Sequence, residues 1–108
     1  MKLIKCIIRQ DKLSAVIEKL ADNVPGLTVS EVRGHGRQKG HSAVYRGVEY
    51  SVDLLPKTMI ETVVDDSRVE DVINLVRNAA MTGQIGDGRI FIHDVEEAYH
   101  VRTGFMDR

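Results

Sequence analysis

The sequence lacks several features that would place it in a special class. It contains one cysteine, Cys6, and no tryptophan. A lone cysteine cannot form a disulfide within the chain, and its apolar neighbours predict a small buried side chain. No apolar run approaches the roughly 20 residues that a membrane-spanning helix needs. The opening residues MKLIKCIIR are too short and too charged for a signal peptide. We therefore expect a cytoplasmic protein without direct membrane insertion.

Neither sign of charge is in excess. The 15 basic and 16 acidic residues give a net charge of −1 and a pI of about 6.4. A general nucleic-acid binder would be strongly basic. Aromatic residues form only 5% of the chain, so base-stacking platforms are scarce. We expect no nucleic-acid partner.

The chain does have a regular spacing of apolar residues, which changes between the pattern of a strand and that of a helix. Two strand–helix–strand patterns are separated by a long segment without regular period. We expect strands at 2–9, 27–33, 58–64 and 89–93, and helices at 11–22 and 67–80. Apolar residues at positions i, i+3 and i+4 predict one apolar face on each helix. These faces contain Leu13, Val16, Ile17, Leu20 and Ala21 in the first helix, and Val69, Val72, Ile73, Val76, Ala79 and Ala80 in the second.

Helix starts can also be predicted. Asp11 is a candidate N-cap for the first helix. Ser67 and Glu70 have the S-x-x-E spacing of a capping box at the second. In the tail, residues 97–102 alternate, which predicts a short extra strand with His100 and Arg102 on one face.

This order of elements predicts an α+β, ferredoxin-like βαββαβ sandwich in a single domain, 1–108, with helices on one sheet face. A long loop, about 36–54, joins the second and third strands. Because the strands carry apolar residues on both faces, we expect the uncovered face to meet other subunits in a homo-oligomer.

Two segments share a form that suits phosphate. GHGR (34–37) and GDGR (86–89) each place glycine N–H groups beside an arginine, and together they could cradle a polyphosphate. On the motif alone a tight turn is the more common explanation. Neither segment matches a P-loop or a Rossmann fingerprint. The four histidines lack chelating spacing, and no catalytic nucleophile can be named from spacing.

Longer motifs point to a family. GRQKGH (36–41), YRGVEY (45–50), LLPK (54–57) and TGQIGDGRIFI (82–92) resemble those of the nitrogen regulatory protein PII family, in the same order and spacing. The resemblance implies trimers that bind ATP or ADP between subunits and sense 2-oxoglutarate together with Mg-ATP. It implies that the long segment is the mobile T-loop, which docks on target proteins such as an ammonium channel or nitrogen-metabolism enzymes. We therefore expect a signal-transduction protein and not an enzyme.

The resemblance also assigns residues. Lys57 matches the cation that faces the distal carboxylate of 2-oxoglutarate, and Gln38 matches the side chain that helps to hold Mg²⁺ and the effector. Tyr50 matches the tyrosine that a uridylyltransferase modifies in some members. The positions that match the nucleotide site are Thr28, Gly36, Arg37, Gln38, Val63, Gly86, Asp87, Gly88, Arg89, His100 and Arg102.

The sequence departs from the family pattern at a few positions. Gln10-Asp11 replaces a usual Pro-Phe, and Val48 replaces a small residue beside Tyr50. His100 stands where arginine is usual, and at neutral pH a histidine carries less charge, which bears on the preference for ATP over ADP.

Three alternative functions remain open. One is a divergent PII paralogue that binds adenine nucleotide but answers another metabolite. The second is an RNA-binding ferredoxin-like domain, which the scarcity of aromatic residues disfavours. The third is a small phosphate-ester or acylphosphate hydrolase, for which no nucleophile can be named.

Overall fold

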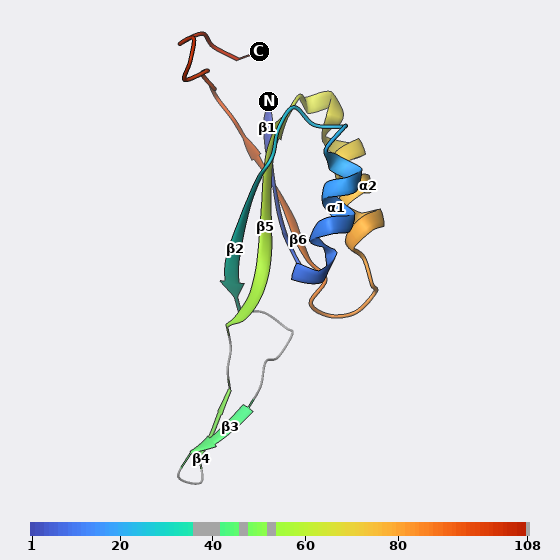
Figure 1. Cartoon of the computed structure of the whole chain (residues 1–108), viewed down its shortest axis with the longest axis vertical. Helices are drawn as coiled ribbons and strands as arrows, with labels where there is room; N and C mark the ends of the chain where they lie inside the picture. The colour runs from blue at the N-terminus through green and yellow to red at the C-terminus, as the bar shows by residue number, and fades with distance from the viewer. Residues whose placement is uncertain (36–41, 46–47, 52–53, 108) are drawn as a thin grey trace.

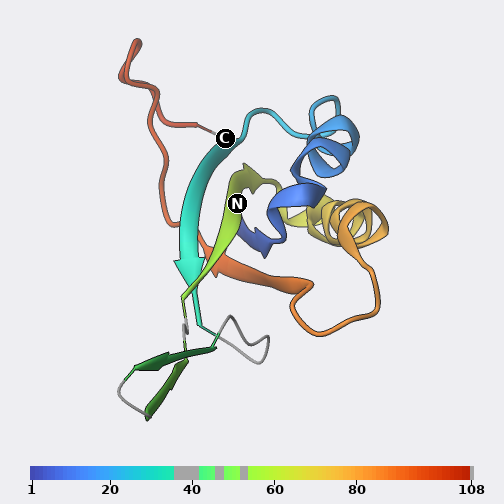
Figure 2. The same cartoon turned by 60° about the horizontal axis from the view of Figure 1, so that its bottom comes forward.

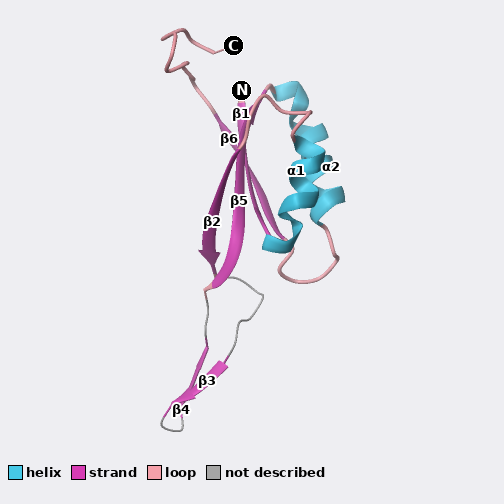
Figure 3. Ribbon diagram, viewed as in Figure 1, coloured by secondary structure: helices cyan, strands magenta, loops and turns pink. Residues whose placement is uncertain are grey.

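A four-stranded antiparallel sheet forms the centre of the fold. The computed structural model describes residues 1–35, 42–45, 48–51 and 54–107. The strands are arranged in the order β2-β5-β1-β6, and two helices lie side by side on one face of the sheet (Figures 1 and 3). The bounds of these elements are β1 Lys2–Ile8, α1 Leu13–Leu20, β2 Thr28–Gly34, β5 Leu55–Val64, α2 Val69–Ala80 and β6 Gly88–Asp94. The α+β ferredoxin-like prediction is confirmed.

The core lies between the helices and one face of the sheet. Side chains alternate along a strand, so every second residue of β1 and β5 faces the helices. Ile4, Cys6 and Ile60 are buried there against Val16 and Val72 of the helices. The predicted burial of Cys6 is confirmed. Of the predicted helical faces, Ala21 alone is exposed and stands at the end of α1.

No helix of the described residues covers the opposite face of the sheet (Figure 2). The strand registers place Leu3 beside Val63, and Ile7 beside Met59, on this face. Phe91 of β6 lies next to Lys5 on the same face and is 41% exposed. Figure 2 shows both helices on the other side of the sheet. We call the surface formed by Leu3, Ile7, Met59, Val63 and Phe91 the open face.

The expected helix caps are wrong. Each helix is preceded by a 3-10 turn, Gln10–Lys12 before α1 and Asp66–Arg68 before α2. Asp11 and Ser67 lie inside these turns, and no side-chain hydrogen bond caps either helix. Each helix instead continues directly from its 3-10 turn.

The tail is not the strand that its alternation predicts. Residues 101–103 form a turn, and Gly104 has a φ of +74° that lets the chain fold back. The N–H of His100 donates to Phe105 O at 3.0 Å, and Tyr99 bridges to Met106. His100 and Arg102 therefore do not share a strand face, because the chain turns between them and does not continue as an extended strand.

The segment between β2 and β5 contains regular structure that its sequence does not predict. Two short antiparallel strands, β3 Ser42–Tyr45 and β4 Val48–Ser51, form a separate two-stranded sheet. Within the described ranges, no helix is long and apolar enough to cross a membrane.

Candidate functional site

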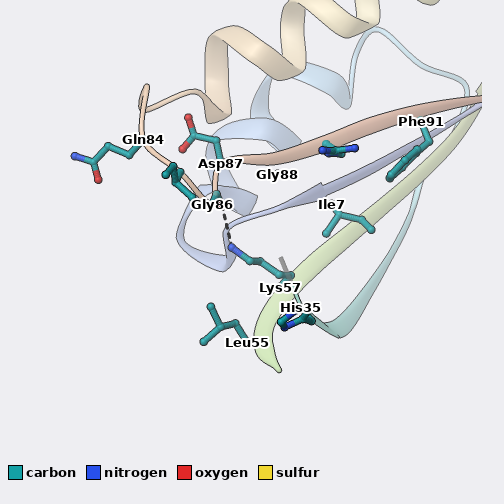
Figure 4. Close-up of a pocket in the computed structure, with 12 residues that line it drawn as sticks. Ile7, His35, Leu55, Lys57, Gln84, Gly86, Asp87, Gly88 and Phe91 are labelled. Carbon is teal, nitrogen blue, oxygen red and sulfur yellow. Dashed lines mark hydrogen bonds between the residues drawn. The ribbon is translucent and has the colours of Figure 1, made fainter. Parts of the chain in front are cut away.

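A pocket of about 580 Å³ lies at the end of the sheet where β2 ends and where β5 and β6 begin (Figure 4). Its wall combines apolar side chains of the open face with cations and a glycine-rich turn. It is lined by Ile7, Gly34, His35, Leu55, Lys57, Gln84, Ile85, Gly86, Asp87, Gly88, Arg89 and Phe91. Its volume falls within the range of small-molecule sites.

The turn between α2 and β6, residues 82–88, forms one wall of this pocket, and we call it the glycine loop. Gly86 and Gly88 have φ values of +100° and +112°, a region that favours glycine. A Cβ at Gly88 would lie 1.7 Å from the carbonyl oxygen of Ile7. The close approach of this loop to β1 therefore requires glycine at position 88.

Asp87 fixes the shape of the glycine loop from within. Its carboxylate accepts hydrogen bonds from the N–H groups of Thr82 at 2.8 Å and Gly83 at 2.9 Å, and from the Thr82 hydroxyl. The Arg9 Nε donates to it at 3.3 Å. The hydrogen bonds from Thr82, followed by those from Gly83 and Arg9, hold the pKa of Asp87 well below its ordinary value. The side chain of Asp87 is therefore committed to the loop itself.

Two cations hold the loop from the sheet side. The Lys57 ammonium donates to the carbonyl oxygen of Gly86 at 2.9 Å (Figure 4). Arg9, at the end of β1, donates from Nη2 to the carbonyl oxygen of Ile85 at 2.7 Å. Partial burial, with the nearby charge of Arg9, lowers the pKa of Lys57. The sequence offers no motif that would have identified Arg9, since it simply follows an apolar strand.

The structure brings together part of the predicted site. Lys57 lines the pocket, as do all of the residues from Gly86 to Arg89. Thr28 and Val63 lie at the other end of the sheet, where Thr28 pairs with Glu61 and Val63 with Leu3. Six residues of extended strand separate Lys57 from Val63, or roughly 20 Å.

Of the other predicted residues, those that the structure describes do not line the pocket. His100 and Arg102 belong to the tail, which leaves the sheet at the end opposite the pocket (Figure 1). Gly36, Arg37 and Gln38 lie outside the described residues. The backbone of Tyr50 is described, and it pairs with Ala43 in the β3–β4 hairpin.

Comparison with known proteins agrees with this fold. The family model described as "Nitrogen regulatory protein P-II" matches residues 1–105. A nitrogen regulatory protein P-II from Pasteurella multocida is 52% identical over 105 residues, covering 96% of this chain and 94% of the relative. Nitrogen regulatory protein GlnK from Escherichia coli K12 is 48% identical over 108 residues, covering 99% of this chain and 96% of the relative. The chain belongs to the nitrogen regulatory protein P-II family.

Proposed function

We propose that the chain is a homotrimeric PII signal-transduction protein that binds ATP or ADP in clefts between subunits. The observation that supports this most is the division of the predicted nucleotide residues between two ends of one sheet. Residues matched to the phosphates line the pocket at one end. Thr28 and Val63, matched to the base, lie toward the other end, with Val63 roughly 20 Å along β5 from Lys57. A single nucleotide can contact both groups if two copies pack along the open face and each contributes one end.

The pocket has the chemistry that a polyphosphate requires. Lys57 and Arg89 supply positive charge, and the glycine loop brings backbone amides close to a ligand. Mg²⁺ in nucleotide sites is held mainly by phosphate oxygens and water, with few protein ligands. Over the described ranges, no three His, Cys, Asp or Glu side chains gather as a metal cluster. This donor set fits Mg²⁺ that arrives with the nucleotide, with Gln38 as the proposed protein ligand.

We assign 2-oxoglutarate to the same end of the sheet. Its distal carboxylate requires a cation, and Lys57 is partly buried beside the glycine loop. Gln38 would complete the site through Mg²⁺. Effector binding would thus require Mg-ATP.

The proposed output is regulation rather than catalysis. The relatives are named as nitrogen regulatory proteins. The segment 36–54 would act as the T-loop that docks on cytoplasmic targets, such as an ammonium channel or nitrogen-metabolism enzymes. Tyr50 would be the position open to a uridylyltransferase.

Calorimetry tests this function directly. ATP and ADP should each bind, and 2-oxoglutarate should bind only when both ATP and Mg²⁺ are present. Binding of ATP and ADP without any response to 2-oxoglutarate would favour a divergent paralogue that answers another metabolite. Absence of nucleotide binding would overturn the proposal.

A further inference from the structure

Arg9 makes two contacts to the glycine loop at once. Its Nε donates to the Asp87 carboxylate at 3.3 Å, and its Nη2 donates to the Ile85 carbonyl oxygen at 2.7 Å. The side chain is 22% exposed and the Asp87 side chain is 23% exposed, so the pair is largely withdrawn from water. The end of β1 is therefore tied to the wall of the pocket.

These contacts control where the amide groups of the loop point. In a planar trans peptide the C=O and N–H groups point in opposite directions. When Arg9 holds the carbonyl of Ile85, the N–H of Gly86 is directed away from Arg9. When Lys57 holds the carbonyl of Gly86, the N–H of Asp87 is likewise directed away from Lys57.

Those two N–H groups have no partner in the described part of the chain. The amides of Gly86 and Asp87 make no hydrogen bond there. Both residues line the pocket. Adjacent amides with a glycine at positive φ form a concavity that binds anions, and Gly86 has a φ of +100°.

From this arrangement we propose that Arg9 is a positioning residue for phosphate binding. It orients the Gly86 and Asp87 amides toward the anionic oxygens of the nucleotide without itself having to contact them. This inference rests on the nucleotide-binding function proposed above. It adds a residue that neither the motifs nor the resemblance assigns to the site.

The role requires arginine rather than any cation. A guanidinium presents donors on Nε and Nη2 in one rigid plane, so it can reach a carboxylate and a carbonyl together. A lysine at position 9 would keep the charge but present a single ammonium on a flexible stem. Arg9→Lys therefore separates the positioning role from a general attraction between positive charge and phosphate.

The test compares ligands with and without phosphate. ADP and ATP affinities are measured by calorimetry, and adenosine binding by ligand-observed NMR, which reaches weak dissociation constants. Arg9→Lys should lower the affinities for ADP and ATP about tenfold, the effect of losing one charge-assisted hydrogen bond. The affinity for adenosine should stay within about twofold of wild type. Arg9→Gln should show the same split. Arg68→Lys, which changes an exposed arginine paired with Asp71 on α2, is the matched control and should bind all three ligands normally.

The possible failures are distinguishable. Wild-type ADP affinity in Arg9→Lys would overturn the positioning role while leaving the proposed function intact. A parallel loss of adenosine would also overturn it, because the whole subunit rather than the phosphate wall would then be altered. Wild-type protein that binds neither nucleotide would reject the proposed function itself, and the inference with it.

Discussion

At the scale of the residue, the side chain of Asp87 holds the shape of the glycine loop. It accepts hydrogen bonds from two amides, one hydroxyl and one guanidinium, all of which favour its ionised form. The residues of the GDGR motif line the pocket. The motif does not indicate that the aspartate faces its own loop, because that depends on Thr82 and Arg9, which lie outside the motif.

The depressed pKa of Asp87 has a consequence for stability in acid. A carboxyl group whose pKa is lower in the folded state stabilises that state above its unfolded pKa. This contribution is lost as the pH falls from the ordinary value of 3.8 toward the folded value. Asp87→Asn should therefore be less stable than wild type at neutral pH, and the difference should shrink below about pH 4.

Urea unfolding at neutral pH and at two acidic pH values measures this difference. Asp22→Asn, a change at an exposed aspartate after α1, is the control and should follow wild type throughout. A constant gap between wild type and Asp87→Asn at every pH would show that ionisation of this carboxyl does not stabilise the loop.

Lys57 provides a second test at this scale. Lys57→Ala removes the cation proposed to meet the distal carboxylate of 2-oxoglutarate, and unpairing a buried charge commonly costs about 3–5 kcal/mol. Calorimetry in Mg-ATP should detect no 2-oxoglutarate binding, while ADP should still bind, with reduced affinity, because Arg89 and the glycine loop remain at the pocket. Lys19→Ala, at an exposed lysine of α1, serves as the control. Equal effector affinity in wild type and Lys57→Ala would reject this role.

At the scale of the element, periodicity predicts strands and helices but not how they begin and end. The i, i+3, i+4 spacing finds both helices because their stability comes from burying one face. The predicted N-caps are wrong because Asp11 and Ser67 lie inside the 3-10 turns that precede the two helices. Apolar periodicity does not distinguish such a turn from a capped helix start. The predicted tail strand is wrong because residues 97–102 pair with no strand of the sheet in the described part of the chain, and Gly104 permits a reversal of the chain.

The glycine loop depends most on a single position. A side chain at Gly88 would collide with the backbone of Ile7 and occupy a strained φ. Gly88→Ala should destabilise the fold by about 3 kcal/mol or more and weaken ADP binding, as judged by chemical unfolding and calorimetry. Gly26→Ala is the matched control, because a Cβ there meets no atom within 4 Å. Equal stability of the two variants would contradict the observed packing of the loop on β1.

At the scale of the whole molecule, the open face is an apolar surface that no helix of the described residues covers (Figure 2). Apolar residues on both faces of the strands predict such a surface from the sequence. Alternation along one strand cannot reveal that the proposed phosphate residues and the proposed base residues lie toward opposite ends of one sheet, because that requires the register of the strands. The resemblance assigns residues to both parts of the proposed site but does not give their separation.

The assembly itself can be measured by light scattering. Wild type should give a mass of about 36 kDa, three times the chain mass of 12.1 kDa. Met59→Asp places a charge in the middle of the open face and should give monomers, because burying an unpaired charge costs several kcal/mol. Asn74→Asp, on the exposed side of α2, should leave the mass unchanged. A monomeric wild type would contradict the trimer.

The most direct test of the shared site is complementation between two defective chains. Arg89→Glu should prevent phosphate binding at the pocket, and Thr28→Tyr should block the proposed base site toward the other end of the sheet. Both side chains are exposed. Each variant alone should assemble as wild type does but fail to bind ADP. When the two are unfolded together and refolded as mixed trimers, each cleft takes one end from each of two neighbours, so about one quarter of the clefts should be intact. The account predicts that ADP binding returns with wild-type affinity at about a quarter of the wild-type stoichiometry. Mixed trimers that bind no ADP would show that the two ends do not meet across subunits.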